Sequence, residues 1–95
     1  MSAPEVCRGV AARVKQRRLE LNLTQQGLAS RADVNIETYR KFERTGEIAF
    51  VSLAKVAFAL NALDDFNLLF SQKKYQGIED VLQSKSNIRK RGKKL

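Results

Sequence analysis

The segment 36–44 combines residue types that recognise nucleic acids. At helical spacing its large apolar residues, Tyr39 and Phe42, would point into a protein core. The opposite, outward side would then carry Ile36, Glu37, Thr38 (at its edge), Arg40, Lys41 and Arg44. Arg and Lys donate to guanine acceptors or phosphates, Glu accepts from the amino group of cytosine, and an aliphatic side chain packs on a thymine methyl group. The pattern therefore predicts a helix able to contact base pairs in a major groove.

Two acidic residues of this segment have different expected roles. Glu37 lies near the helix start, where phosphates would repel it, which indicates either base contact or a contact with the positive end of the helix dipole. In the alternative interpretation, Glu37 stabilises the first turn and pairs with Lys41 four residues later. Glu43 is expected to face the protein, with Arg18 or Arg44 as its partner.

The residues before this segment predict another short helix and a tight turn. A helix over 25–31 would follow Thr24, whose hydroxyl can cap its first backbone N–H groups. Gln25, at the positive end of that helix, is suited to a phosphate contact; the alternative is a solvated helix start. Asp33 lies in the turn, where a positive φ is expected, and Asn35 caps the next helix. Two helices joined in this way form a DNA-binding helix-turn-helix.

Three further helices complete an expected all-α fold, a compact bundle of five. They cover residues 4–21, with Ser2 and Glu5 as a capping box, about 50–60, and a short fifth helix capped by Asp64. The first helix would bury Val6, Val10, Val14 and Leu21 and expose Arg8, Arg13, Lys15, Gln16 and Arg18. The fifth would carry the apolar residues Phe66, Leu69 and Phe70.

The chain divides into three parts by composition. Residues 1–70 are the expected helix-turn-helix domain, residues 71–83 a polar linker with a short helix, and residues 84–95 a basic tail that is expected to be disordered. The net charge of +8 indicates a polyanionic partner. Residues 85–95 hold six of the 18 basic side chains and no acid. Residues 1–84 therefore have 12 basic and 10 acidic side chains, a net charge of +2. The domain must therefore concentrate its charge on one face.

Composition argues against an enzyme. The chain has no His and one Cys, so it lacks the commonest general base and the ligands of a zinc site, and we expect no catalytic, cofactor-binding or metal-binding residues. The lone Cys7 fits a reducing cytosol. The N-terminal residues lack the apolar core of a secretory signal, and no apolar run approaches the roughly 18 residues of a membrane span. The expected location is cytoplasmic.

The run from Leu23 to Gly46 resembles the Xre/Cro type of helix-turn-helix, found in lambdoid phage repressors, antitoxins and restriction controllers. The likeness extends over about residues 10–70. It is carried by Leu23-Thr24-Gln25, Leu28-Ala29, Val34, Thr38-Tyr39 and Phe42-Glu43-Arg44. The sequence departs from the family pattern at Asp33, where Gly is usual, at Gly27, where a polar residue is usual, and at Thr45, which adds a residue before Gly46.

The resemblance implies a lambda-repressor-like domain that binds double-stranded DNA, usually as a twofold dimer on a palindromic operator. The family contacts fall on Gln25, Asn35, Ile36, Glu37, Thr38, Arg40 and Lys41. We therefore expect a sequence-specific transcriptional regulator, and our main expectation is a dimeric repressor. An autoregulating antitoxin with a toxin partner is a sub-case, and a restriction-modification controller fits nearly as well. The alternative from another class is an interaction module that mainly binds and restrains a partner protein.

Overall fold

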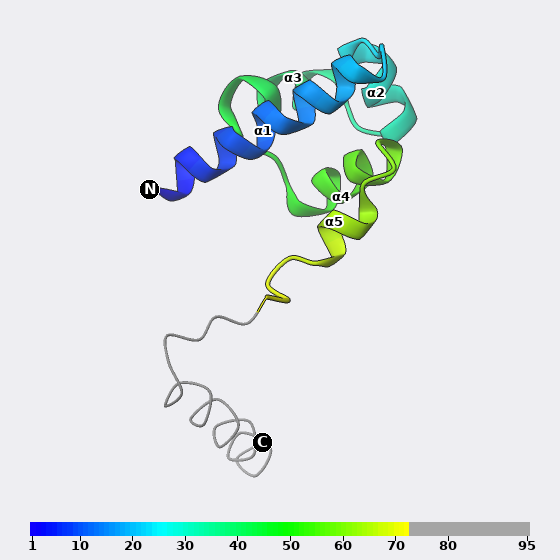
Figure 1. Cartoon of the computed structure of the whole chain (residues 1–95). Helices are drawn as coiled ribbons and strands as arrows, with labels where there is room; N and C mark the ends of the chain where they lie inside the picture. Colours follow the sequence, from blue (N-terminus) through cyan, green and yellow to red (C-terminus); the bar gives the residue numbers. More distant parts are fainter. Residues whose placement is uncertain (73–95) are drawn as a thin grey trace, which may run out of the picture.

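A computed structural model describes residues 1–72, in which every regular element is an α-helix (Figure 1). Within these residues there are five α-helices and no strand: α1 (Ala3–Glu20), α2 (Gln25–Ala32), α3 (Ile36–Thr45), α4 (Phe50–Ala59) and α5 (Leu63–Asn67). The predicted all-α class is confirmed for this part of the chain. The linker helix expected near residue 80 and the basic tail expected over 84–95 lie outside the described residues.

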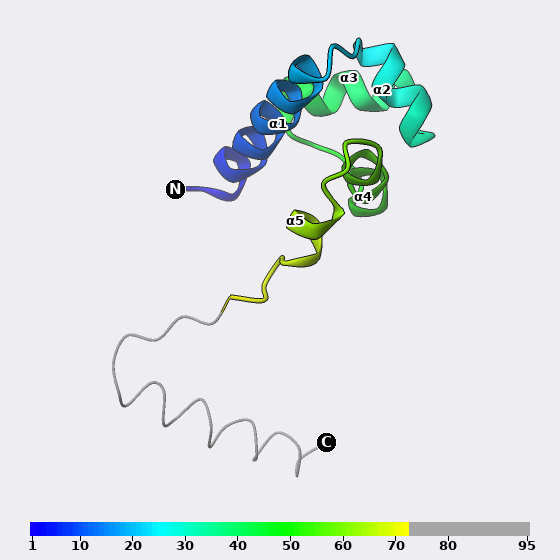
Figure 2. The same cartoon turned by 45° about the vertical axis from the view of Figure 1, so that its right-hand side comes forward.

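The helices pack around one core, to which α1, α2, α3 and α4 all contribute side chains. α1 lies beside α3, α2 packs against both α3 and α4, and α5 packs on α4 (Figures 1 and 2). The buried core residues are Ala11, Leu28, Ala29, Ala32, Tyr39, Phe42, Val56 and Leu60. Because α3 contributes the two largest of these side chains, its apolar side is fixed and its polar side must face outward.

Short-range hydrogen bonds set the helix ends where the sequence predicts them. Ser2 Oγ accepts from the backbone N–H of Glu5 at 3.2 Å, and Thr24 Oγ1 accepts from that of Gly27 at 2.9 Å. At Gly27 an added Cβ would lie 3.1 Å from this hydroxyl, so the missing side chain leaves room for the cap. The positive φ predicted at Asp33 is confirmed at +56°, and Asn22 and Asn61 adopt the same left-handed conformation, with φ of +57° and +59°.

Two predictions about helix ends and faces are wrong. Asp64 does not cap α5: the cap position is Ala62, and Asp64 lies inside the first turn, where its charge still favours the helix dipole. α5 also ends at Asn67, before Leu69 and Phe70.

The inner side of α1 also differs from the predicted valine stripe. Its buried residues are Ala11 and Arg18, while Val10 and Val14 are half-buried and Val6 is exposed. Ala11 and Arg18 are two turns apart on one face, and a small residue there allows α1 to approach its neighbours closely. Arg18, predicted to be on the solvent side, has a side chain only 8% exposed because it has a buried acidic partner.

Gly46 ends α3 and allows the connection to α4 to pass close to α1. Its φ is +85°, and an added Cβ would lie 2.8 Å from the backbone of Cys7 and Arg8. We expect Gly46→Ala to lower the free energy of unfolding by more than the roughly 1–2 kcal/mol of a left-handed residue alone. Urea unfolding measures this change. Gly9→Ala is the control, because a Cβ there makes only a 3.5 Å contact and a helical Ala gains stability. Equal stability of Gly46→Ala and wild type would contradict the prediction.

Candidate nucleic-acid interface

The exposed side of α3 carries most of the side chains that the sequence assigned to recognition. Glu37, Thr38, Arg40, Lys41 and Arg44 are exposed, while Tyr39 and Phe42 on the other side are 0% and 1% exposed. Ile36 differs from the prediction, because it is half-buried and packs against the core. The outward surface of α3 is therefore polar along its length and carries three cations and one carboxylate.

A buried hydrogen-bond network fixes α3 relative to α1 and α2. Arg18 donates through Nε to Glu43 Oε2 at 2.8 Å and through Nη2 to Oε1 at 3.2 Å. Its Nη1 donates to the carbonyl oxygen of Leu23 at 2.8 Å. Glu43 also accepts from the Tyr39 hydroxyl, and from Gln25 Nε2 at 3.0 Å. The predicted Arg18 pairing of Glu43 is confirmed, and the network joins α1, α2, α3 and the α1–α2 connection.

The network favours the charged forms of both Arg18 and Glu43. Burial acts to raise the pKa of Glu43, but the hydrogen bonds from Arg18, Tyr39 and Gln25 outweigh it and hold the pKa below its usual value. The hydrogen bond to Glu43 raises the pKa of Arg18. Burial, together with the bond to the Glu43 carboxylate, raises the pKa of Tyr39 above its ordinary value. Glu43 is thus ionised and compensated inside the protein at neutral pH.

Two predicted contact residues already use part of their polar groups within the protein. The Gln25 amide nitrogen donates to Glu43, so the orientation of this side chain at the start of α2 is set by the network. Asn35 Oδ1 accepts from the backbone N–H groups of Glu37 and Thr38 at 2.8 and 3.2 Å, which confirms its capping role. A DNA contact by either residue would use its remaining groups.

The exposed charges of α3 make weak pairs that can be exchanged for a ligand. Glu37 pairs with Arg40 at 3.0 Å, three residues on, and not with Lys41. Lys41 instead lies 3.6 Å from Glu47. Exposed pairs of this kind contribute only about 0–1 kcal/mol. Arg40 and Lys41 are therefore available to an anionic partner at low cost.

A basic residue of α1 joins this surface, and the sequence did not single it out. Lys15, Gln25, Arg40, Glu43 and Arg44 line a shallow concavity of about 330 Å³. Lys15 was one of several cations on the outer side of α1, and only its packing next to α3 distinguishes it from the others. The concavity joins α1, the start of α2 and the second half of α3.

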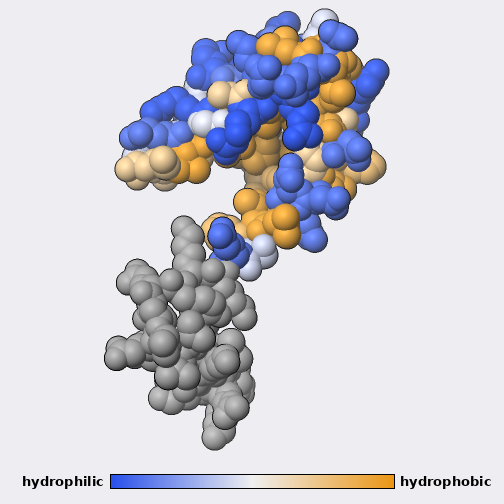
Figure 3. Space-filling view, viewed as in Figure 1, coloured by the Kyte–Doolittle hydropathy of each residue, from blue (hydrophilic) through white to orange (hydrophobic). Residues whose placement is uncertain are grey.

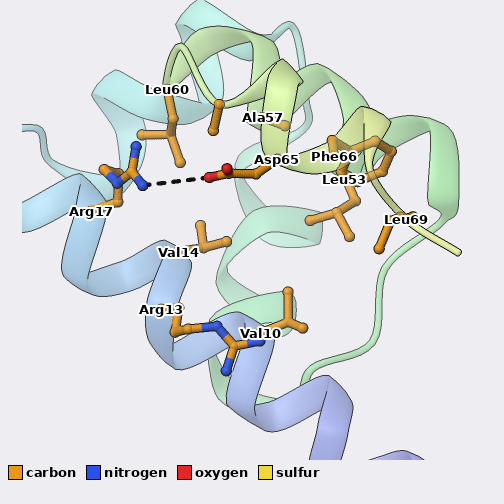
Figure 4. Close-up of a pocket in the computed structure, with 11 residues that line it drawn as sticks. Val10, Arg13, Val14, Arg17, Leu53, Ala57, Leu60, Asp65, Phe66 and Leu69 are labelled. Carbon is orange, nitrogen blue, oxygen red and sulfur yellow. Dashed lines mark ion pairs between the residues drawn. The ribbon is translucent and has the colours of Figure 1, made fainter. Parts of the chain in front are cut away.

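A second depression lies between α1, α4 and α5, and it is apolar. Val10, Val14, Leu53, Ala57 and Leu60 face into it, and Arg17 pairs with Asp65 at 3.8 Å across its end (Figure 4). Apolar side chains also gather at the surface over α4 and α5 (Figure 3). The large exposed apolar residues of this region are Phe50, Val51, Phe58, Leu63, Leu68, Leu69 and Phe70. So much exposed apolar surface is typical of a protein-interaction site.

The sequence matches no protein-family model and no curated protein. Within residues 1–72, no helix is both long enough and apolar enough to span a bilayer. The same residues hold no group of three Cys, Asp or Glu side chains positioned to bind a metal ion.

Proposed function

We propose that the protein is a sequence-specific DNA-binding regulator of the Xre/Cro type, with a lambda-repressor-like domain. In this proposal α2 and α3 are the helix-turn-helix, and α3 lies in the major groove of double-stranded DNA. The contacts come from Gln25 and Asn35 and from the exposed side of α3: Glu37, Thr38, Arg40, Lys41 and Arg44. Ile36 contributes only its exposed part, at the start of α3.

One observation carries the proposal most directly, and it is the division of α3 into two sides. Tyr39 and Phe42 anchor one side in the core, and Glu43 ties the helix to Arg18 of α1. The opposite side is left exposed, with three cations and side chains suited to base edges. A short helix held this firmly, with a polar side free of packing, has the form required for insertion into a major groove.

We further propose that the regulator acts as a homodimer, with the apolar surface of α4, α5 and residues 68–70 as the contact between subunits. Exposed apolar surface of this extent is more often covered by a partner than left in water. A twofold dimer would place two copies of α3 on successive major grooves and would select a palindromic site. Repression by blocking polymerase, alone or as the autoregulating antitoxin of a toxin operon, follows from occupancy of such a site.

The same apolar surface favours a second candidate, an interaction module that mainly binds a partner protein. The two functions differ in what α3 does. Selection of bound duplexes from a random-sequence pool by the full chain tests this directly. The regulator should enrich one motif, with dyad symmetry if the dimer forms. An interaction module would enrich none.

A further inference from the structure

We propose that Lys15, Arg40 and Arg44 form a three-cation site for neighbouring backbone phosphates of the bound duplex. This assignment rests on the proposed DNA-binding function and deepens it, because it separates the groups that bind phosphate from those that contact bases. The three side chains come from two helices and line the same concavity of about 330 Å³, together with Gln25 and Glu43.

The charge balance of the concavity favours an anion. Among residues 1–72, neither Lys15 nor Arg44 takes part in an ion pair, and Arg40 has only the exposed Glu37. The one acid that lines the concavity, Glu43, has a side chain 6% exposed and is paired with Arg18. Three cations therefore surround a space whose only carboxylate is already neutralised. Arg and Lys form strong, charge-assisted hydrogen bonds with phosphate oxygens.

The position of the concavity indicates a phosphate of the DNA backbone. It lies at the edge of the exposed side of α3, where α1 and the start of α2 meet that helix. When a recognition helix is in the major groove, the flanking elements approach the sugar-phosphate backbone. Arg40 and Arg44 would then contribute affinity without sequence information. Base contacts would fall to Glu37, Thr38 and Lys41.

The salt dependence of binding to a mixed-sequence duplex tests the assignment. Each phosphate contact adds about 0.9 to the slope of log K against log salt. For the full-length Lys15→Gln chain, the ratio of wild-type to variant affinity should therefore fall about 3.5-fold between roughly 50 and 200 mM salt. Arg13→Gln is the matched control. It removes the same charge from an exposed position of α1 that lines the apolar groove instead.

The outcomes separate this assignment from the proposed function. The three-cation site is supported if affinity depends less steeply on salt for Lys15→Gln than for wild type, while Arg13→Gln keeps the wild-type salt dependence. If the wild-type chain binds DNA and the two variants have equal salt slopes, the three-cation site is overturned and the proposed function still stands. No binding of any duplex by the wild-type chain overturns both. A change in sequence preference on Lys15→Gln would also overturn the assignment, because the loss of a phosphate contact lowers affinity for all sequences alike.

Discussion

Replacing Arg18 by Met should lower the free energy of unfolding by about 3–5 kcal/mol, because it leaves the Glu43 carboxylate buried without its cation. That is a large part of the roughly 5–15 kcal/mol available to a small domain. Urea unfolding measures the loss. Arg17→Met is the matched control, since Arg17 is the neighbouring residue and its pair with Asp65 is exposed and 3.8 Å long. The control should lose at most about 1 kcal/mol.

Two companion measurements identify the ion pair as the cause. The double variant Arg18→Met with Glu43→Leu should be more stable than Arg18→Met alone, because no buried charge is left unpaired. The second companion measurement is the pH dependence of the free energy of unfolding. The pKa of Glu43 is lower in the folded protein than in the unfolded chain, so its stabilising effect is complete above the unfolded pKa and is lost as pH falls through the folded one. Glu43→Gln should remove that part of the acid sensitivity. An Arg18→Met loss no larger than that of Arg17→Met would contradict this account.

Neutralising Arg40 and Lys41 together should weaken binding to the preferred duplex by about 300-fold. The figure combines a base contact of ~2 kcal/mol with a phosphate contact worth about tenfold near 0.1 M salt. Both side chains are exposed, so the fold should be unaffected. Fluorescence anisotropy with the full chain measures the affinity.

The control for this prediction removes two charges elsewhere. Arg13→Gln with Lys55→Gln changes exposed residues of α1 and α4 that do not belong to the α3 surface. It should reduce affinity much less. Tight, sequence-specific binding by the Arg40→Gln, Lys41→Gln chain would rule out α3 as the helix that contacts bases.

Local chemistry made much of the fold predictable. The caps at Ser2, Thr24 and Asn35 depend on atoms within three residues, and the left-handed ends depend on Asn and Asp in their own turns. The two sides of α3 follow from the spacing of Tyr39 and Phe42. These features need no knowledge of distant parts of the chain.

Other features depend on residues far apart in sequence, and hydropathy does not reveal them. Arg18 meets Glu43 across 25 residues, and the charge that suggested solvent exposure is the group that the buried pair requires. Lys15 is one of several cations on α1 and is distinguished only by the helix beside it. The sequence does not show that Phe50, Val51 and Phe58 of α4 are exposed, because an apolar residue in a helix pattern does not indicate whether the protein interior or a partner covers it.

The central claim is that α3 recognises a DNA sequence. Its most direct test is the ratio of affinities of the full chain for the duplex selected from a random pool and for a scrambled duplex of the same composition. The claim predicts a ratio of about 10³ or more in wild type at physiological salt. It also predicts a much lower ratio for the Arg40→Gln, Lys41→Gln chain. A wild-type ratio near one, or an unchanged ratio in that variant, would contradict it.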